Sequence, residues 1–341
     1  MISRIHPIPF GRKWIGPGLP VVIIAEIGIN HEGDFETCIR LVEAAARSGA
    51  DAVKLITVRA SENYAPDTES FAVFSRSELK PAETAAAFGR ARELGMECFS
   101  TCGDFVSAEF VGTLEPAAWK VSSGLLTHLP LIQRLSETGL SLLLSTGMSS
   151  MKDAARAVEI ARKSGARHIG LFQCTSLYPA PPELLNLRSI RSMLSEFNVP
   201  VGLSDHSDGY LAPAIAVAAG AMMIEKHFSL DPTRPGFDHR VSLNPTEFSR
   251  MVETVRTAEQ MLGSEIKDVP EAVRQVARRN LRGLAAARDI PKDKQIEASD
   301  LGVMRVAGEK GLPPEALSTI PGRLAARDIA AYEPITQEDI Q

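Results

Sequence analysis

The sequence is poor in cysteine, has no excess of basic residues and contains no long apolar run. The four cysteines, Cys38, Cys98, Cys102 and Cys174, include no Cys-x-x-Cys pair, so a structural zinc site is not expected. We expect free thiols in a reducing compartment. No apolar stretch reaches the roughly 20 residues that a membrane-spanning helix needs, so we expect no contact with a membrane.

The net charge argues against a nucleic-acid-binding protein, and the amino-terminal segment argues against a protein with a signal peptide. Lys and Arg number 37 against 42 Asp and Glu, so the net charge of −5 leaves no electrostatic footprint for nucleic acid. Residues 1–18 are rich in Pro, Gly and basic residues and lack the apolar core of a signal peptide, so we expect a cytoplasmic protein. With 341 residues, 44% of them hydrophobic, the chain can form one large domain plus a smaller one.

Short apolar runs alternate with amphipathic helical patterns over about the first 265 residues. Continuous apolar runs are typical of parallel strands that are buried on both faces. The eight runs cover residues 21–25, 52–56, 97–100, 118–121, 141–144, 168–172, 199–203 and 222–225. Eight such units predict an α/β fold, a (β/α)8 TIM barrel. The alternative, a doubly wound open sheet, would usually carry a Gly-rich loop after an early strand, whereas Gly16-Pro17-Gly18 precedes the first run.

The character of the sequence changes after the barrel region. Segment Ala286-Ala-Arg-Asp-Ile290 recurs as Ala325-Ala-Arg-Asp-Ile329, a repeat of about 39 residues that predicts two related halves of one small module. A module of about 60 residues buries a marginal core, so docking onto the barrel or onto another subunit would stabilise it. We predict a barrel domain over 1–265, a linker over 266–281 and a small domain over 282–341.

Polar side chains follow nearly every apolar run, at the strand ends where barrel active sites form. His206 and His227 each close a run, so the two imidazoles could meet at one divalent metal ion, Mn²⁺, Mg²⁺ or Zn²⁺. Lys54 and Lys120 belong to strand-like runs, where desolvation disfavours a charge. Two such lysines indicate an anionic ligand, phosphate or carboxylate. Glu26 beside a metal could act as a base or hold a water.

The histidines also have structural interpretations. A single histidine at a strand end is more often a hydrogen-bonded core residue than a ligand, and spacing alone leaves both open for the pair. His31 and His239 could contact a substrate or could be plain surface groups. We interpret His6, His128 and His168 as structural.

Several of these segments belong to longer motifs that resemble the sialic acid synthase family, which comprises N-acetylneuraminate synthase and its nonulosonate relatives. The motifs are Ala25-Glu-Ile-Gly-Ile-Asn-His-Glu-Gly33, Leu144-Ser-Thr-Gly-Met148, Gly202-Leu-Ser-Asp-His206, Glu225-Lys-His-Phe228 and Arg234-Pro-Gly-Phe-Asp238. The carboxyl-terminal repeat is similar to that family's antifreeze-like (SAF) domain. The resemblance spans nearly the whole chain.

The resemblance implies a (β/α)8 barrel whose SAF domain is exchanged across a homodimer. It implies that phosphoenolpyruvate (PEP) condenses with an open-chain N-acylated aminosugar, giving a nine-carbon 2-keto-3-deoxy acid and phosphate. The implied catalytic residues are Glu26, His206 and His227, and the two histidines are expected to bind a divalent metal, often Mn²⁺ in the family. The implied PEP ligands are Lys54, Thr101, Lys120, Ser123, Ser145 and Ser204. The implied sugar contacts are Tyr178, Asp238 and Arg305, the last from the partner's SAF domain.

Three departures from the family pattern fall on the sugar side. Leu125 replaces a usual acidic residue, Leu55 and Ile56 stand where a Gln is usual, and Ser176-Leu177 replaces an Asn before the Tyr-Pro pair. A buried polar group that faces a missing hydroxyl costs roughly 1–3 kcal/mol, so apolar replacements suit a less polar sugar. We expect an acceptor with fewer free hydroxyls than N-acetylmannosamine, either deoxygenated or more heavily acylated.

Two alternatives stay open. One is another 2-keto-3-deoxy acid synthase or metal aldolase on the same barrel, which would use a phosphorylated sugar and call for extra Arg or Lys on the sugar side. The other is a non-catalytic sugar-binding relative, which would fail to bind PEP.

Overall fold

The computed structural model describes residues 5–236, 238–306 and 311–341, so Phe237 of the Arg234–Asp238 motif lies outside the described residues. The chain divides into two compact units, Met1–Gly263 and Ser264–Gln341. Among the helices of the described residues, none is both long and apolar enough to cross a membrane. All four cysteines are buried free thiols.

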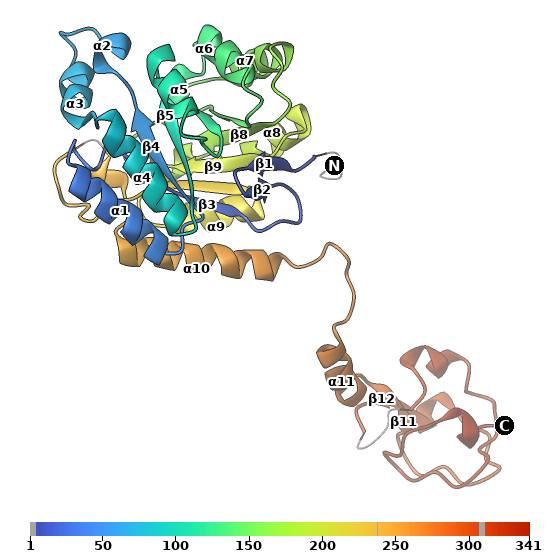
Figure 1. Ribbon diagram of the computed structural model, residues 1–341. Coiled ribbons are helices and arrows are strands. Elements are labelled where there is room, and N and C mark those ends of the chain that lie inside the picture. Colours follow the sequence, from blue (N-terminus) through green and yellow to red (C-terminus); the bar gives the residue numbers. More distant parts are fainter. Residues whose placement is uncertain (1–4, 237, 307–310) are drawn as a thin grey trace. The chain divides into compact units, whose positions relative to one another are not determined.

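In the larger unit, eight parallel strands close into a barrel in the order β10-β3-β4-β5-β6-β7-β8-β9 (Figure 1). Each of the eight apolar runs overlaps one of these strands, which confirms the predicted (β/α)8 fold. The barrel strands are β3 (Val22–Gly28), β4 (Ala52–Thr57), β5 (Glu97–Cys102), β6 (Trp119–Val121), β7 (Leu142–Ser145), β8 (Ile169–Cys174), β9 (Val201–Asp205) and β10 (Met223–His227).

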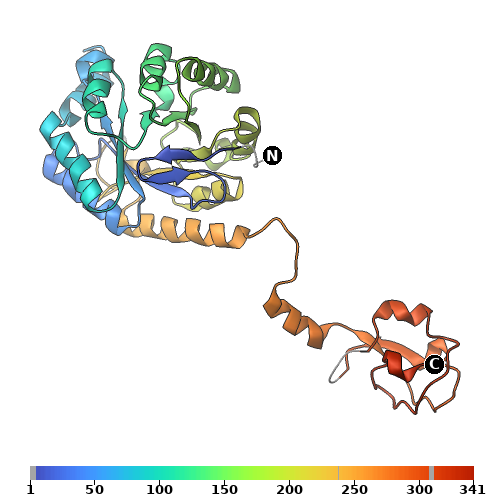
Figure 2. The same ribbon diagram turned by 45° about the vertical axis from the view of Figure 1, so that its right-hand side comes forward.

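Helices surround this barrel (Figures 1 and 2). They are α1 (Phe35–Arg47), α2 (Ala60–Asn63), α3 (Glu69–Ser77), α4 (Pro81–Glu93), α5 (Phe105–Gly112), α6 (Leu129–Ser136), α7 (Met151–Lys163), α8 (Ser189–Phe197), α9 (Leu211–Ala218) and α10 (Pro245–Leu262). Ser150 caps α7, because its side chain accepts from the backbone N–H of Asp153. Helix α4 begins at Pro81, because proline suits the first helical position and Glu83 accepts from the Lys80 N–H at 2.9 Å.

The strand register places polar side chains at one level near the carboxyl ends of the strands. Residues directly opposite each other on adjacent strands lie close enough for their side chains to interact. The relevant pairs are Glu26 with Lys54, Glu26 with His227, Thr101 with Lys120, and Ser204 with Glu225. Residues that are far apart in the sequence are thereby gathered at one rim of the barrel.

A hairpin of β1 (Ile8–Phe10) and β2 (Lys13–Ile15) packs against the opposite, amino-terminal end of the barrel. Phe10 is fully buried, and its ring meets that of Phe99 edge-on with centroids 5.2 Å apart. The Gly11 N–H donates to the Ala117 carbonyl at 3.1 Å, just before β6 begins. The hairpin therefore contributes apolar surface and hydrogen bonds to the end of the barrel that lies away from the polar rim.

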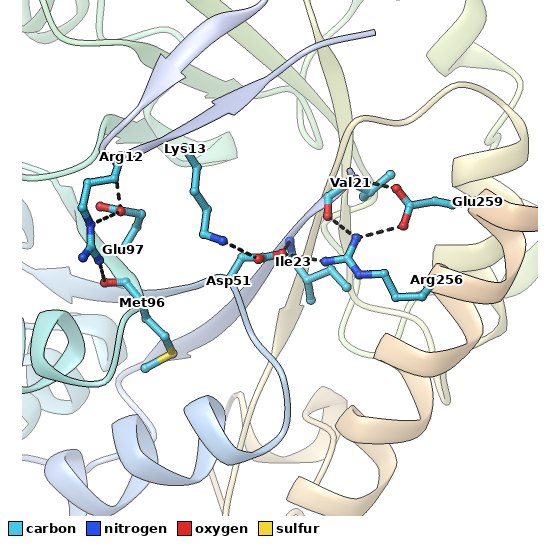
Figure 3. Close-up of polar contacts among 9 residues, drawn as sticks. All are labelled: Arg12, Lys13, Val21, Ile23, Asp51, Met96, Glu97, Arg256 and Glu259. Carbon is cyan, nitrogen blue, oxygen red and sulfur yellow. Dashed lines mark hydrogen bonds and ion pairs between the residues drawn. The ribbon is translucent and has the colours of Figure 1, made fainter. Parts of the chain in front are cut away.

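Ion pairs hold this hairpin in place (Figure 3). Arg12 Nε donates to Glu97 Oε1 at 2.8 Å, at the first residue of β5. Lys13 Nζ donates to Asp51 Oδ1 at 2.8 Å, and Arg256 of α10 donates to Asp51 Oδ2 at 2.8 Å. Asp51, which directly precedes β4, therefore joins the hairpin to the last helix of the barrel.

The smaller unit is built from α11 (Glu271–Asn280), β11 (Gly283–Ala286), β12 (Leu301–Met304) and irregular segments. The predicted repeat is confirmed, because Ile290 and Ile329, which are equivalent in the two copies, exchange backbone hydrogen bonds of 2.8 and 2.9 Å. Each copy also contains an equivalent Arg–Asp ion pair. The two pairs are Arg288 with Asp300 at 3.2 Å and Arg327 with Asp339 at 2.7 Å. The two halves thus share contacts as well as sequence.

Candidate active site

A cavity of about 470 Å³ opens at the carboxyl-terminal rim of the barrel strands. All the site residues that were predicted within the barrel line this cavity. They are Glu26, Lys54, Thr101, Lys120, Ser123, Ser145, Tyr178, Ser204, His206, His227 and Asp238. Arg305 belongs to the smaller unit, where its guanidinium donates to the Asn280 carbonyl at 3.3 Å.

Two lysines and two glutamates form a buried cluster in the cavity wall. Lys120 Nζ donates to both carboxylate oxygens of Glu225, at 2.8 and 3.0 Å. Lys54 pairs closely with Glu26, lies 3.9 Å from Glu225 and donates to Thr101 Oγ1 at 3.2 Å. All four charged side chains are at most 5% exposed. Their charges are therefore compensated inside the protein, yet the two ammonium groups face a cavity that an anion can enter.

The two carboxyl groups of this cluster differ in acidity. Burial raises the pKa of Glu26 to about 7, although Lys54 opposes the rise. Burial acts on Glu225 in the same direction, but Lys120 and Lys54 together lower the pKa of that group to about 2. Carboxyl groups whose pKa values are driven apart by their surroundings are typical of acid–base sites. Near neutral pH, Glu225 stays charged whereas Glu26 can exchange a proton.

The polar atoms of the cavity differ in how far the protein itself satisfies them. Ser123 Oγ accepts from the Gly147 N–H at 2.9 Å and also hydrogen-bonds with the Cys174 side chain. Ser145 Oγ is buried and has no hydrogen-bond partner among the described residues. The same holds for Glu26 Oε1 and His227 Nδ1. Buried polar atoms without partners are rare, so these three atoms indicate where a ligand completes the site.

His206 and His227 lie next to each other, with ring centroids 5.2 Å apart. Tyr178 stacks on His206 at 4.2 Å and meets His227 edge-on at 5.9 Å. His206 Nδ1 is 2.9 Å from the Thr175 carbonyl, which must accept a proton from it, so the lone pair of this imidazole is on Nε2. Burial lowers the pKa of His227 well below its ordinary range, so its ring is neutral. Burial alone would lower the pKa of His206, but its hydrogen bonds with Cys174 and the Thr175 carbonyl raise it. His227 is therefore in the neutral state that binds metal ions, and His206 offers Nε2 to a metal ion when its ring is neutral.

The donor set fits a divalent cation with open coordination positions. Within the described residues, no group of three or more His, Cys, Asp or Glu side chains is arranged to hold a metal ion. His206 and His227 would thus supply two nitrogen ligands, and water or substrate oxygens would supply the others. Asp238 Oδ2, 3.7 Å from His227 Nδ1, is a nearby carboxylate.

Some cavity residues were not among the predicted site residues. Glu225 precedes His227 by two positions and so faces the same side of its strand, a signal that could have identified it. Cys174 lies with Sγ 3.7 Å from His206 Nδ1. Ser70 and Phe74 come from α3, and no local pattern predicts that this short helix borders the cavity.

Two groups of predictions remain: those for His31 and His239, and those for the positions that depart from the family pattern. His31 and His239 are buried, so neither is a surface group. His31 Nδ1 accepts from the Gly33 N–H at 3.1 Å.

Of the positions that depart from the family pattern, Ile56 and Ser176 line the cavity. Leu125 instead packs against the hydrophobic core and Leu55 is buried within it, and neither is among the described residues that line the cavity.

A closed (β/α)8 barrel with this rim of buried lysines, carboxylates and imidazoles defines a TIM-barrel enzyme. The sequence profile of the NeuB family matches residues 41–267, and that of the SAF domain matches residues 281–341. The chain belongs to the NeuB family and is an N-acetylneuraminate synthase-like transferase.

Relatives resemble the chain over most of its length. It is 36% identical to an uncharacterized protein of Methanocaldococcus jannaschii, over 98% of this chain and 99% of the relative. It is 33% identical to N,N'-diacetyllegionaminic acid synthase of Legionella pneumophila, over 97% and 98% of the two chains. The crystal structure of N-acetylneuraminic acid (sialic acid) synthetase from Leptospira borgpetersenii matches with a TM-score of 0.76 at 30% identity, covering 80% of this chain and 95% of that one.

Proposed function

We propose that the protein condenses PEP with an open-chain N-acylated aminosugar, giving a nine-carbon 2-keto-3-deoxy acid and phosphate. The observation that carries the proposal is that Lys54 and Lys120 share one cavity with His206 and His227. The lysines suit an anionic substrate, and the imidazoles suit a metal beside a carbonyl group. Membership of the NeuB family and similarity to the Legionella pneumophila synthase support the same reaction class.

PEP belongs at the lysine end of the cavity. Lys54 and Lys120 would compensate the charges of its carboxylate and phosphate. Thr101 and Ser145 would donate hydrogen bonds to its oxygens, and Ser123 and Ser204 would do so on releasing their present partners, Cys174 and Glu225. The unpartnered hydroxyl of Ser145 supports this assignment. A bound anion would replace part of the lysines' contacts with Glu26 and Glu225.

The acceptor aldehyde belongs at the histidine end. His206 and His227 would hold a divalent cation, and we propose Mn²⁺. When bound, the cation would act as a Lewis acid that polarises the aldehyde. The Thr175 carbonyl orients His206, and the stacked Tyr178 restricts that ring and borders the space for the sugar.

The proposed reaction forms a carbon–carbon bond and a carbon–oxygen bond to water, and it breaks the carbon–oxygen bond to phosphate. C3 of PEP attacks the aldehyde carbon, which leaves C2 electron-poor. Water adds to C2, and the adduct expels phosphate as the bond between C2 and the phosphate oxygen breaks and C2 becomes the keto carbon. Of the two protons of the water, one ends on the alkoxide oxygen of the former aldehyde and the other on the released phosphate. Glu26, with a pKa of about 7, would take the proton of that water. Lys54 and Lys120 would stabilise the departing phosphate.

For the acceptor, we propose a sugar with fewer free hydroxyls than N-acetylmannosamine. Ile56 presents an apolar side chain to the cavity where the family pattern has an amide. Tyr178 and Asp238 would contact the sugar. Because Ile56 cannot receive a hydroxyl proton, a hydroxyl at that point of the sugar would lose a partner on binding.

We further propose a homodimer in which SAF domains are exchanged and Arg305 reaches the partner's acceptor site. Arg305 is exposed within its own unit, which leaves it able to make a contact elsewhere. Mixing Glu26→Gln protein with Arg305→Ala protein tests this arrangement. Exchanged domains give some mixed dimers one intact site, so activity should return on mixing. Domains that serve their own barrel would give no recovery.

Phosphate release from PEP across a panel of N-acylated mannose- and altrose-type sugars tests the reaction. We expect release that depends on the sugar, disappears with EDTA and returns with Mn²⁺. His206→Ala and Lys54→Met should abolish it, whereas His6→Ala, at an exposed histidine, should not. Release only with sugar phosphates would indicate the alternative synthase or aldolase, and absence of PEP binding by calorimetry would indicate a non-catalytic relative. A clear preference for N-acetylmannosamine would overturn the proposed acceptor.

A further inference from the structure

A second cavity, of about 680 Å³, adjoins the candidate active site. Ile29 and Asp238 line both cavities. Asp238 also lies close to the histidines, with Oδ2 3.7 Å from His227 Nδ1. The two cavities therefore meet at Ile29 and Asp238, beside His227.

Helix α3 forms part of the wall of both cavities. Ser70 and Phe74 line the active-site cavity, whereas Glu69, Val73 and Arg76 line the second one. Positions four and three residues apart lie on the same face of a helix. The face of α3 that borders the second cavity therefore presents, in order, a hydrogen-bond acceptor (Glu69), an apolar side chain (Val73) and a donor (Arg76).

The charges of the second cavity disfavour an anion. Glu32, Glu69 and Asp238 line it, and Arg76 is the one Lys or Arg among its lining residues in the described part of the chain. Glu32 already pairs with Arg234. A phosphate group in this cavity would therefore face the carboxylates of Glu69 and Asp238 with a single opposing cation.

We propose that the second cavity binds the distal acylamino group of an unphosphorylated acceptor sugar. Glu69 accepts the amide N–H, Arg76 donates to the amide carbonyl, and Val73 and Ile29 contact the acyl methyl group. A hydroxyl at the same carbon can also donate and accept, but it offers no apolar group to Val73 and Ile29. This inference rests on the proposed function and extends it by assigning the part of the protein that selects the acceptor.

Steady-state kinetics of Arg76→Met and Glu69→Gln test the assignment with a 2,4-diacetamido-trideoxyhexose as acceptor. Each variant should raise the KM for this sugar about tenfold, because a hydrogen bond to a charged group is lost. The KM for PEP should stay within about twofold in both, because PEP belongs to the other cavity. Ser75→Ala is the matched control, since Ser75 is exposed on the same helix and lines neither cavity.

A charge reversal gives a second, independent readout. Glu69→Lys should improve kcat/KM for an N-acylated sugar 6-phosphate about tenfold or more, because two cations would then face the phosphate. The same change should lower kcat/KM for the diacetamido sugar.

The outcomes separate this inference from the proposed function. If the unaltered enzyme releases phosphate with none of the sugars, the proposed function fails and the inference falls with it. If the enzyme uses the diacetamido sugar but Arg76→Met and Glu69→Gln leave its KM unchanged, only the inference fails. Changes in Tm or oligomeric state without a change in KM would show that the cavity serves the protein's own packing, which also overturns it.

Discussion

Lys226 and Asp205 form a buried ion pair directly behind the two histidines of the active-site cavity. Lys226 Nζ lies 2.8 Å from Asp205 Oδ2, and both side chains are 0% exposed. Each residue adjoins one histidine in sequence, His227 or His206, and successive strand residues point to opposite faces. The ion pair therefore ties the ends of β9 and β10 together on the face away from the cavity.

Breaking this ion pair should destabilise the protein strongly. Lys226→Met leaves the Asp205 charge buried without its cation, and we expect a loss of about 3–5 kcal/mol in the free energy of unfolding. The double change Lys226→Met with Asp205→Leu should recover most of the loss, because no uncompensated charge is left. Denaturant unfolding measures all three proteins.

The control for this prediction is an exposed ion pair. Lys163 and Glu159 are 68% and 61% exposed, so Lys163→Met should change the free energy of unfolding by less than about 1 kcal/mol. Equal losses of unfolding free energy in Lys163→Met and Lys226→Met would show that the buried ion pair contributes no more to stability than the exposed one.

The pH dependence of catalysis should report the unusual acidity of Glu26. Because the carboxylate is the proposed base, kcat/KM should rise with pH through about 7 and then level off. Glu26→Gln should lower the rate about 10²–10⁴-fold and remove this limb of the profile. Glu225→Gln should move the limb to lower pH, since the charge of Glu225 helps to raise the pKa of Glu26. An unshifted limb in Glu225→Gln would assign the titration to another group.

The same pKa makes a prediction for stability. Between pH 4.5, the ordinary value for a glutamate, and about pH 7, the folded protein holds the Glu26 proton more tightly than the unfolded chain does. Stability from this residue is therefore lost as the pH rises through that window. The free energy of unfolding of Glu26→Gln lacks this loss. From pH 5 to pH 7.5 it should therefore rise by on the order of 2–3 kcal/mol relative to that of the unaltered protein. Denaturant unfolding at the two values measures the gain, and Glu159→Gln should show none.

Local sequence patterns predict the barrel and most of its rim for a physical reason. A strand buried on both faces is apolar throughout, so a charged residue within it, such as Lys120, needs a ligand or a buried partner. Strand ends of a barrel share one rim, so the positions of Lys54, His206 and His227 in the sequence are enough to predict one shared site. The family motifs then extended the set to the serines of the cavity.

What the sequence could not predict depends on contacts between distant segments. Lys120 and Glu225 are 105 positions apart and pair only because the barrel closes. The place of α3 beside both cavities, with Glu69 and Arg76 facing the second one, depends on how the segment after β4 packs. The helical pattern in the sequence of α3 does not predict which loops this helix contacts.

The amino-terminal end of the barrel offers a test of stability that is separate from the active site. The carboxylate of Asp51 accepts from Lys13 Nζ and Arg256 at 2.8 Å each, and from the Ile23 N–H at 3.0 Å (Figure 3). Asp51→Ala leaves that N–H and two cations without their acceptor, and we expect a loss of about 2–4 kcal/mol in the free energy of unfolding. Lys13→Met should cost about 1 kcal/mol or less, because Lys13 is partly exposed and Asp51 keeps its other partners. The KM for PEP should stay unchanged in both proteins, because the hairpin packs at the end of the barrel opposite the cavity. A loss of PEP affinity in Asp51→Ala without loss of stability would show that the two ends of the barrel are coupled.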